Sequence, residues 1–116
     1  MGLFKKLFGE KNPPAPEHAV IVEFYDFGTD LSDLFELESR LEAKVLESAV
    51  GELDGNEVAT DGSDGRLYFY GPDADQLFAC IRPILEESPL MRGAKATIQY
   101  GPPGDGVREI EVSLGT

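Results

Sequence analysis

The sequence has very few of the side chains that form cross-links or bind transition metals. Among its 116 residues are one cysteine, Cys80, and one histidine, His18. A single cysteine excludes a disulfide within the chain, and one cysteine with one histidine excludes a Cys/His zinc site. No apolar run approaches the roughly 20 residues of a membrane-spanning helix, and no apolar segment of signal-peptide length opens the chain. We therefore expect no metal, no cofactor and a cytoplasmic location.

Positive charge is scarce and unevenly placed. Ten Lys and Arg face 22 Asp and Glu, so the net charge is −12. Residues 1–16 contain three lysines and one glutamate, a net of +2, which leaves −14 on residues 17–116. Such an acidic body repels nucleic acid and anionic lipid and attracts basic partners. The composition therefore favours a basic protein partner and disfavours nucleic acid.

The first 16 residues form a basic, amphipathic tail and a spacer. Helical spacing places the apolar residues of the tail on one face, beside two lysines; the apolar residues are Leu3, Phe4, Leu7 and Phe8. Three prolines between residues 13 and 16 predict an extended spacer. The tail is suited to weak contact with a membrane surface or to docking in a groove of a partner. A structureless leader is the alternative.

Residues 17–116 are predicted to form one domain of short elements. Alternating apolar residues predict strands, and stripes of 3.6-residue period predict helices. The expected strands span 19–27, 52–59, 66–70, 94–100 and 107–114, and the expected helices 31–48 and 74–87. Asp30 is the predicted N-cap of the first helix, and Gly51 is predicted to close it. The last strand should alternate Ile110, Val112 and Leu114 with Glu109, Glu111 and Ser113.

This order of elements predicts an α+β fold. A βαββαβ arrangement is that of the ferredoxin-like two-layer sandwich, in which two helices cover one face of a largely antiparallel sheet. The expected strand order is 4-1-3-2, with the additional C-terminal strand beside the fourth.

Three segments carry a resemblance to other proteins. They are Glu52-Leu-Asp-Gly-Asn-Glu57, Tyr68-Phe-Tyr-Gly-Pro-Asp-Ala-Asp75 and Tyr100-Gly-Pro-Pro-Gly104. Together they resemble small stand-alone uncharacterised bacterial proteins over residues 50–104. The resemblance implies a bacterial cytosolic protein and brings no activity with it. Acylphosphatases, which share the layout, hold phosphate with an Arg in the loop after the first strand, and the loop 27–30 has none.

The sheet face without helices is the first candidate site. It should present Tyr25, Arg66, Tyr68, Tyr70 and Lys95. Tyrosines flanked by cations resemble the stacking platform of RNA-recognition motifs, although the negative charge of the domain opposes phosphate binding. The same residues could support cross-strand pairs on an amphipathic outer face. They could also pack against a second copy, giving a homodimer, or against another protein.

Glu38 and Glu42 are the second candidate site. They lie one helical turn apart at the margin of the apolar stripe of the first helix. Two carboxylates held in a low-dielectric site could perform acid–base chemistry or bind a cation. Solvated residues at the boundary of the helix are the simpler interpretation.

The sequence thus favours a non-enzymatic protein-interaction domain, of immunity type against a basic toxin or regulatory. The first alternative is a regulatory domain that binds a small molecule as a dimer. The second alternative is an enzyme that uses Glu38 and Glu42.

Overall fold

A computed structural model describes residues 17–102 and 106–115. The elements, in chain order, are β1 (His18–Tyr25), α2 (Ser32–Ser48), β2 (Glu52–Val58), β3 (Asp64–Gly71), α3 (Ala74–Glu87), the 3₁₀ helix η1 (Pro89–Met91), β4 (Lys95–Gln99) and β5 (Glu109–Ser113). All seven predicted elements are present, and η1 is the one that was not predicted. The predicted docking residues Leu3, Phe4, Leu7 and Phe8 lie outside the described residues.

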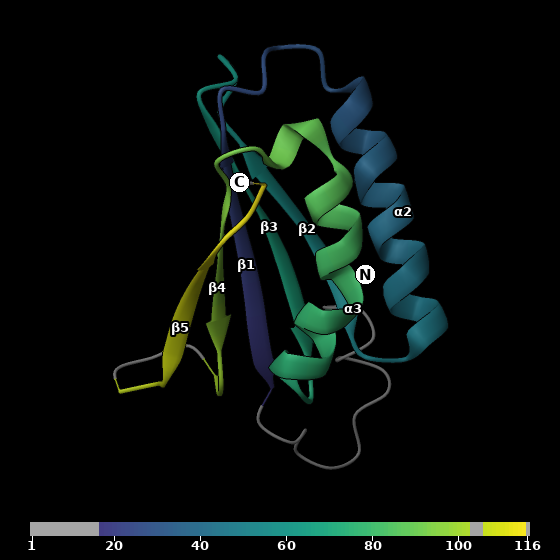
Figure 1. Cartoon of the computed structure of the whole chain (residues 1–116), viewed down its shortest axis with the longest axis vertical. Helices are drawn as coiled ribbons and strands as arrows, with labels where there is room; N and C mark the ends of the chain where they lie inside the picture. The colour runs from purple at the N-terminus through teal and green to yellow at the C-terminus, as the bar shows by residue number, and fades with distance from the viewer. Residues whose placement is uncertain (1–16, 103–105, 116) are drawn as a thin grey trace.

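The five strands form one antiparallel sheet in the order β2-β3-β1-β4-β5. This is the predicted order, with β1 and β3 inside the sheet and β2 and β5 at its edges. Both helices lie on the same face of the sheet, with α2 on the side of β2 (Figure 1). The α+β class and the two-layer arrangement are therefore confirmed. Neither described helix has the length and apolar character that crossing a bilayer requires.

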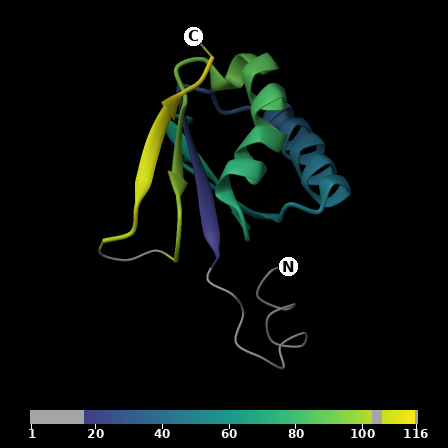
Figure 2. The same cartoon turned by 60° about the horizontal axis from the view of Figure 1, so that its bottom comes forward.

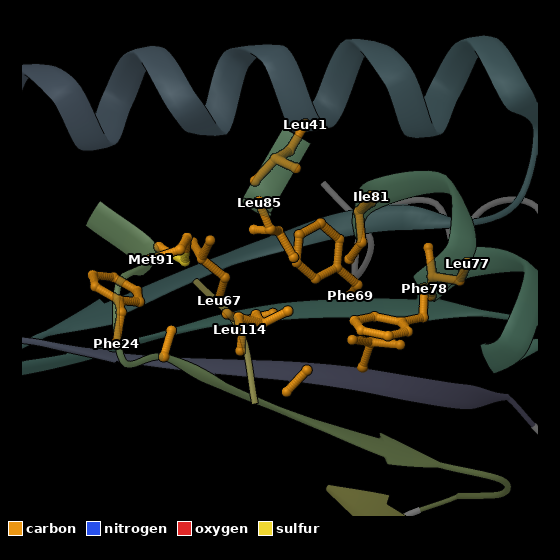
Figure 3. Packing of buried hydrophobic residues seen from close by; sticks show 14 of the residues in the cluster. Phe24, Leu41, Leu67, Phe69, Leu77, Phe78, Ile81, Leu85, Met91 and Leu114 are labelled. Carbon is orange, nitrogen blue, oxygen red and sulfur yellow. The ribbon is translucent and has the colours of Figure 1, made fainter. Parts of the chain in front are cut away.

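The core lies between the helices and one face of the sheet (Figure 3). Alternate residues of β1 and β3 are buried, as the two-residue period of a strand requires. The predicted stripe of α2 is buried along its whole length, and α3 contributes a second apolar face; the two sets are Leu34, Leu37, Leu41 and Val45, and Leu77, Ile81 and Leu85. The opposite sheet face is left for polar and aromatic side chains.

The predicted boundaries of β1 and α2 need correction. β1 ends at Tyr25 rather than at residue 27, because Asp26 takes a positive φ of 52° and turns the chain. The helix begins at Ser32, and Leu31 occupies the cap position. Asp30 still serves the helix end, because its carboxylate accepts the Ser32 N–H at 3.0 Å. That hydrogen bond lowers the pKa of Asp30.

Gly51 does not close the first helix as predicted. The helix ends at Ser48, and Ala49 takes the left-handed conformation at φ 56°. Gly51 is required for a different reason, since a Cβ at this position would lie 2.1 Å from the carbonyl oxygen of Tyr70. The glycine therefore allows the start of β2 to approach the end of β3.

The expected alternation of β5 places Ile110 opposite the buried Ile98 of β4, but Ile110 is not part of the core. Ile110 is 43% exposed, whereas Leu114, just beyond β5, is completely buried. β5 lies at the sheet edge farther from α2, and the helices do not extend over it (Figure 2). The chain returns to the core only after β5, where the Leu114 N–H donates to the carbonyl of Ala94 at 2.8 Å.

Candidate functional site at the β2 edge

The two predicted cations of the open sheet face are joined to carboxylates. The register aligns Glu57, Arg66, Glu23 and Lys95 in one row across β2, β3, β1 and β4. The Arg66 Nε donates to Glu23 Oε2 at 3.1 Å, and the Lys95 Nζ lies 3.7 Å from Glu23 Oε1. Hydrogen bonding to Glu23 raises the pKa of Arg66. Both cations are therefore neutralised within the sheet.

The three predicted tyrosines do not form one platform. Tyr68 and Tyr70 lie together on β3, where they line a hollow next to β2. Tyr25 is at the far end of β1, opposite Asp64, and lines a different pocket. The part of the open face that combines aromatic surface with unneutralised charge is thus the side of β2.

A bulge interrupts β2. Leu53 pairs with Phe69 and Gly55 with Tyr68, so that Asp54 is an extra residue between two consecutive pairs. Gly55 has φ 150°, a conformation that side chains other than hydrogen rarely allow. The Asp54-Gly55 dipeptide within a strand is the sequence signal for this irregularity. The bulge turns Asp54 out of the regular alternation.

Two shallow hollows flank this bulge, one on each face of β2. The hollow on the open sheet face measures about 280 Å³, and the one between β2 and α2 measures about 330 Å³. Asp54 and Gly55 line both. We call their combined lining the β2 edge surface; it consists of Phe35, Glu38, Ser39, Glu42, Leu53, Asp54, Gly55, Asn56, Glu57, Tyr68 and Tyr70.

Among the described residues, the carboxylates of the β2 edge surface have neutral partners or none. Both oxygens of Glu38 accept from Asn56 Nδ2, at 2.6 and 2.8 Å. The Tyr68 hydroxyl donates to Glu57 Oε1 at 2.5 Å, and this bond raises the pKa of Tyr68. Within residues 17–102 and 106–115, no Lys or Arg forms an ion pair with Glu38, Glu42, Asp54 or Glu57. This surface therefore has four negative charges that the described residues leave uncompensated.

Glu38 and Glu42 do not form a buried pair. Glu42 is exposed, and Glu38 is half-buried and bound by Asn56. Over the described ranges, no group of three His, Cys, Asp or Glu side chains is placed to hold a metal ion. The two glutamates are instead part of the acidic wall of the hollow between α2 and β2.

A further pocket, lined by described residues, lies at the opposite end of the sheet from the start of β1. It measures about 840 Å³ and is lined by aromatic, acidic and basic side chains, among them Tyr25, Phe27, Asp33, Glu36 and Arg92. An ion pair of 3.2 Å between Arg40 and Glu87 joins α2 to α3 across it. The pocket is thus of mixed charge, unlike the β2 edge surface.

His18 and Cys80 have structural partners. The Ala74 N–H, at the start of α3, donates to His18 Nδ1 at 3.0 Å, and the His18 ring meets the Tyr100 ring edge-on. The Cys80 Sγ lies 3.7 Å from the Lys44 carbonyl oxygen, to which it donates. These contacts fasten β1 to α3 and α3 to α2.

The chain matches no family model, no curated protein and no solved structure. The candidate site therefore rests on the geometry of this chain alone. Sequence reasoning singled out four of the residues at the β2 edge, Glu38, Glu42, Tyr68 and Tyr70, but assigned them to two separate sites. It missed Phe35, Leu53, Asp54, Asn56 and Glu57. The Asp54-Gly55 dipeptide, which indicates a bulge in β2, was the one signal in the sequence that could have pointed to this surface.

Proposed function

We propose that this protein is a non-enzymatic interaction domain that binds a basic, partly apolar segment of a protein partner along the β2 edge surface. The observation that carries the proposal is the set of four carboxylates, Glu38, Glu42, Asp54 and Glu57, without a cationic partner among the described residues. Carboxylates left in this state gain most from a cation supplied from outside.

Apolar and aromatic groups beside the charges support the same proposal. Phe35 on α2 is 55% exposed and lines the same hollow as the half-buried Leu53. Tyr68 and Tyr70 lie on the other side of the bulge. Aromatic side chains of this kind supply much of the energy of protein interfaces, and charge complementarity increases the association rate. An edge strand also offers backbone groups to an extended segment.

We also propose that the fold is of the ferredoxin-like type. The strand order β2-β3-β1-β4-β5 and the βαββαβ order support a ferredoxin-like sandwich with one added strand. We retain the bacterial resemblance of residues 50–104, the cytoplasmic location and the immunity-type or regulatory role as hypotheses. Because the fold hosts many functions, it does not choose between these roles.

The geometry gives less support to the two other partners considered for the open sheet face. Arg66 and Lys95 are engaged by Glu23, which removes the cations that phosphate binding would use. A homodimer through this face would have to bury the exposed carboxylates of Glu57, Glu109 and Glu111 from both copies, and the desolvation of such charges is unfavourable. Contact of the tail with a lipid surface remains a weaker hypothesis.

Titration of the full chain with a short peptide of alternating lysine and leucine, followed by NMR, tests the proposal. The amide signals of residues 52–58 and 35–42 should move, and the affinity should fall as salt is added. A peptide with glutamate in place of lysine is the control. The proposal is wrong if the lysine peptide moves no signals in these segments, or if both peptides bind equally.

The pocket of about 840 Å³ favours a second candidate function, binding of a small molecule. Its volume is in the range of ligand sites, and Tyr25, Phe27 and Leu90 supply apolar surface between charged groups. A ligand of this pocket should raise the melting temperature of the native chain. The gain should be lost in Arg92→Gln and retained in Glu42→Gln, which lies outside the pocket. A compound that stabilises both variants equally would not be a ligand of this pocket.

A further inference from the structure

We infer that residues 3–8 of this same chain occupy the hollow between α2 and β2 and must be displaced by a partner. The inference rests on the proposed function, because it concerns the same surface. It adds the regulation of that surface by a segment of the chain itself.

The chemistry of the hollow complements that of the segment. Phe35 and Leu53 supply apolar surface to the lining of the hollow, and Glu38, Glu42 and Asp54 supply carboxylates. The segment Leu3-Phe-Lys-Lys-Leu-Phe8 has four apolar residues and two adjacent lysines. An amphipathic segment of this kind is suited to a groove that is apolar at its centre and acidic at its rim.

The other cations of the chain are already engaged or lie elsewhere. In the described residues, five cations form ion pairs; they are Arg40, Lys44, Arg66, Arg82 and Lys95. Arg108 lies over the Tyr100 ring at 4.7 Å, and Arg92 lines the large pocket. Lys5, Lys6 and Lys11 complete the ten cations of the sequence. Lys5 and Lys6 within residues 3–8 are thus cations that could neutralise the carboxylates of the hollow.

The segment can reach the hollow. His18 is level with Gly71, and Glu52 faces Tyr70, so β1 and β2 start at the same end of the sheet with only β3 between them. Two strand spacings amount to roughly 10 Å. Residues 9–16, which include three prolines, can span about 25 Å at about 3.1 Å per residue. This spacer is long enough to bring residues 3–8 to Leu53 and Asp54.

Tethering makes a weak contact sufficient. A short linker gives an attached segment an effective concentration on the order of 1 mM. A segment whose separate dissociation constant is about 0.1 mM would then occupy the hollow in roughly nine molecules of ten. A basic partner would have to displace it, and its apparent affinity would fall about tenfold.

NMR of the full chain tests the contact directly. The variant Leu3→Ser/Phe4→Ser/Leu7→Ser/Phe8→Ser should shift the amide signals of residues 35–42 and 53–56 relative to the native chain. Lys11→Gln, outside the segment, is the control and should leave them in place. Identical signals at the hollow in the native chain and the quadruple variant would overturn the inference.

A charge exchange tests which residues meet. Lys5→Glu/Lys6→Glu should reproduce the shifts of the quadruple variant, because it sets like charges against the hollow. Combination with Glu42→Lys/Asp54→Lys should restore the native pattern of shifts at residues 35–41. Absence of restoration, in a variant whose remaining signals are native, would contradict docking at these carboxylates.

Peptide binding separates this inference from the proposed function. The lysine–leucine peptide should bind the quadruple serine variant about tenfold more tightly than the native chain. Equal affinities would overturn the inference and leave the proposed function intact. If the quadruple variant shifts the signals of the hollow but the peptide binds neither chain, the docking inference stands and the proposed binding of a basic partner fails. Anionic vesicles provide the last comparison. If they capture the native chain, and if the native chain and the quadruple variant give the same signals at the hollow, residues 3–8 bind lipid and the docking inference is overturned.

Discussion

Both edges of the sheet carry carboxylates, but the partners of these carboxylates differ between the two edges. At the β5 edge, Glu111 lies 3.8 Å from the Lys95 ammonium group and Glu109 accepts from Gln99 at 3.0 Å. At the β2 edge, Glu57 accepts from the Tyr68 hydroxyl, and no described cation pairs with any carboxylate of the two hollows. The difference arises in the neighbouring strand. Lys95 on β4 reaches Glu111, whereas Arg66 on β3, which lies opposite Glu57, is bound by Glu23 on β1, and Glu57 accepts from Tyr68 instead.

The edges also differ in what lies beside them. α2 runs alongside β2 and closes a hollow with it, whereas β5 extends past the helices (Figures 1 and 2). The β2 edge therefore combines a hollow with carboxylates that have no cationic partner among the described residues, whereas at the β5 edge Glu111 has Lys95 as a cationic partner. Net charge alone would not distinguish them, and this is why the binding proposal depends on contacts and not on composition.

The largest expected effect concerns how β5 is held. Leu114→Ala should lower the free energy of unfolding by about 2–5 kcal/mol, because the Leu114 side chain is completely buried and its truncation leaves a cavity in the core. Ile110→Ala, in the middle of β5, should cost about 1 kcal/mol or less, since Ile110 is 43% exposed. Chemical denaturation measures both. Equal losses would show that β5 is packed along its whole length.

The second effect concerns binding at the two edges. Glu42→Gln/Asp54→Asn and Glu109→Gln/Glu111→Gln each remove two negative charges. The first pair should weaken binding of the lysine–leucine peptide about tenfold at low salt, or by about 1.4 kcal/mol, and the second about twofold at most. Calorimetry with both variants measures the contrast. Equal weakening would mean that the peptide responds to net charge and not to the β2 edge.

The sequence predicted the fold better than the site, for physical reasons. Apolar periodicity repeats over many residues, so the stripe of Leu34, Leu37, Leu41 and Val45 was found in full. The exposure of Ile110 was not predicted, because alternation gives the face of a strand but not how far the helices extend over that face. The tyrosines and Glu38 were found as separate features. The bulge at Asp54 that brings their hollows together depends on strand register, which a single sequence does not specify at an edge.

A third prediction compares the neutral partners at the two edges. Asn56→Ala should destabilise the domain by about 1 kcal/mol, because Glu38 loses both of its hydrogen bonds. Gln99→Ala at the β5 edge should change stability by about 0.5 kcal/mol or less. Gln99 donates to Glu109, but its own Oε1 is buried without a partner among the described residues, so its removal also relieves a cost. Thermal unfolding of the two variants distinguishes them, and a larger loss for Gln99→Ala would reverse the comparison.

The smallest effects should separate the edges by pH. The Gly115 N–H just after β5 donates to Glu86 Oε1 at 2.8 Å, and this bond, with a smaller contribution from Arg82, lowers the pKa of Glu86 below its usual 4.5. A lowered pKa means that the contact stabilises the fold above the usual value and is lost as the pH falls through the lowered one. The Gly115 amide should therefore become better protected from hydrogen exchange as the pH rises out of the acid range. Glu86→Gln should abolish that pH dependence.

At the β2 edge the pKa shift has the opposite direction, so the contact is lost at high pH instead of low pH. Hydrogen bonding to Glu57, with desolvation as the next cause, raises the pKa of Tyr68 above its usual 10. A raised pKa means that the contact is fully present below the usual value and is lost as the pH rises through the raised one. Ultraviolet titration should show Tyr68 ionising later than tyrosine in the unfolded chain, and Glu57→Gln should move its pKa back towards 10. If Glu57→Gln leaves the titration of Tyr68 unchanged, Glu57 is not its acceptor in solution, and the account of a carboxylate held only by a neutral hydroxyl fails at that residue.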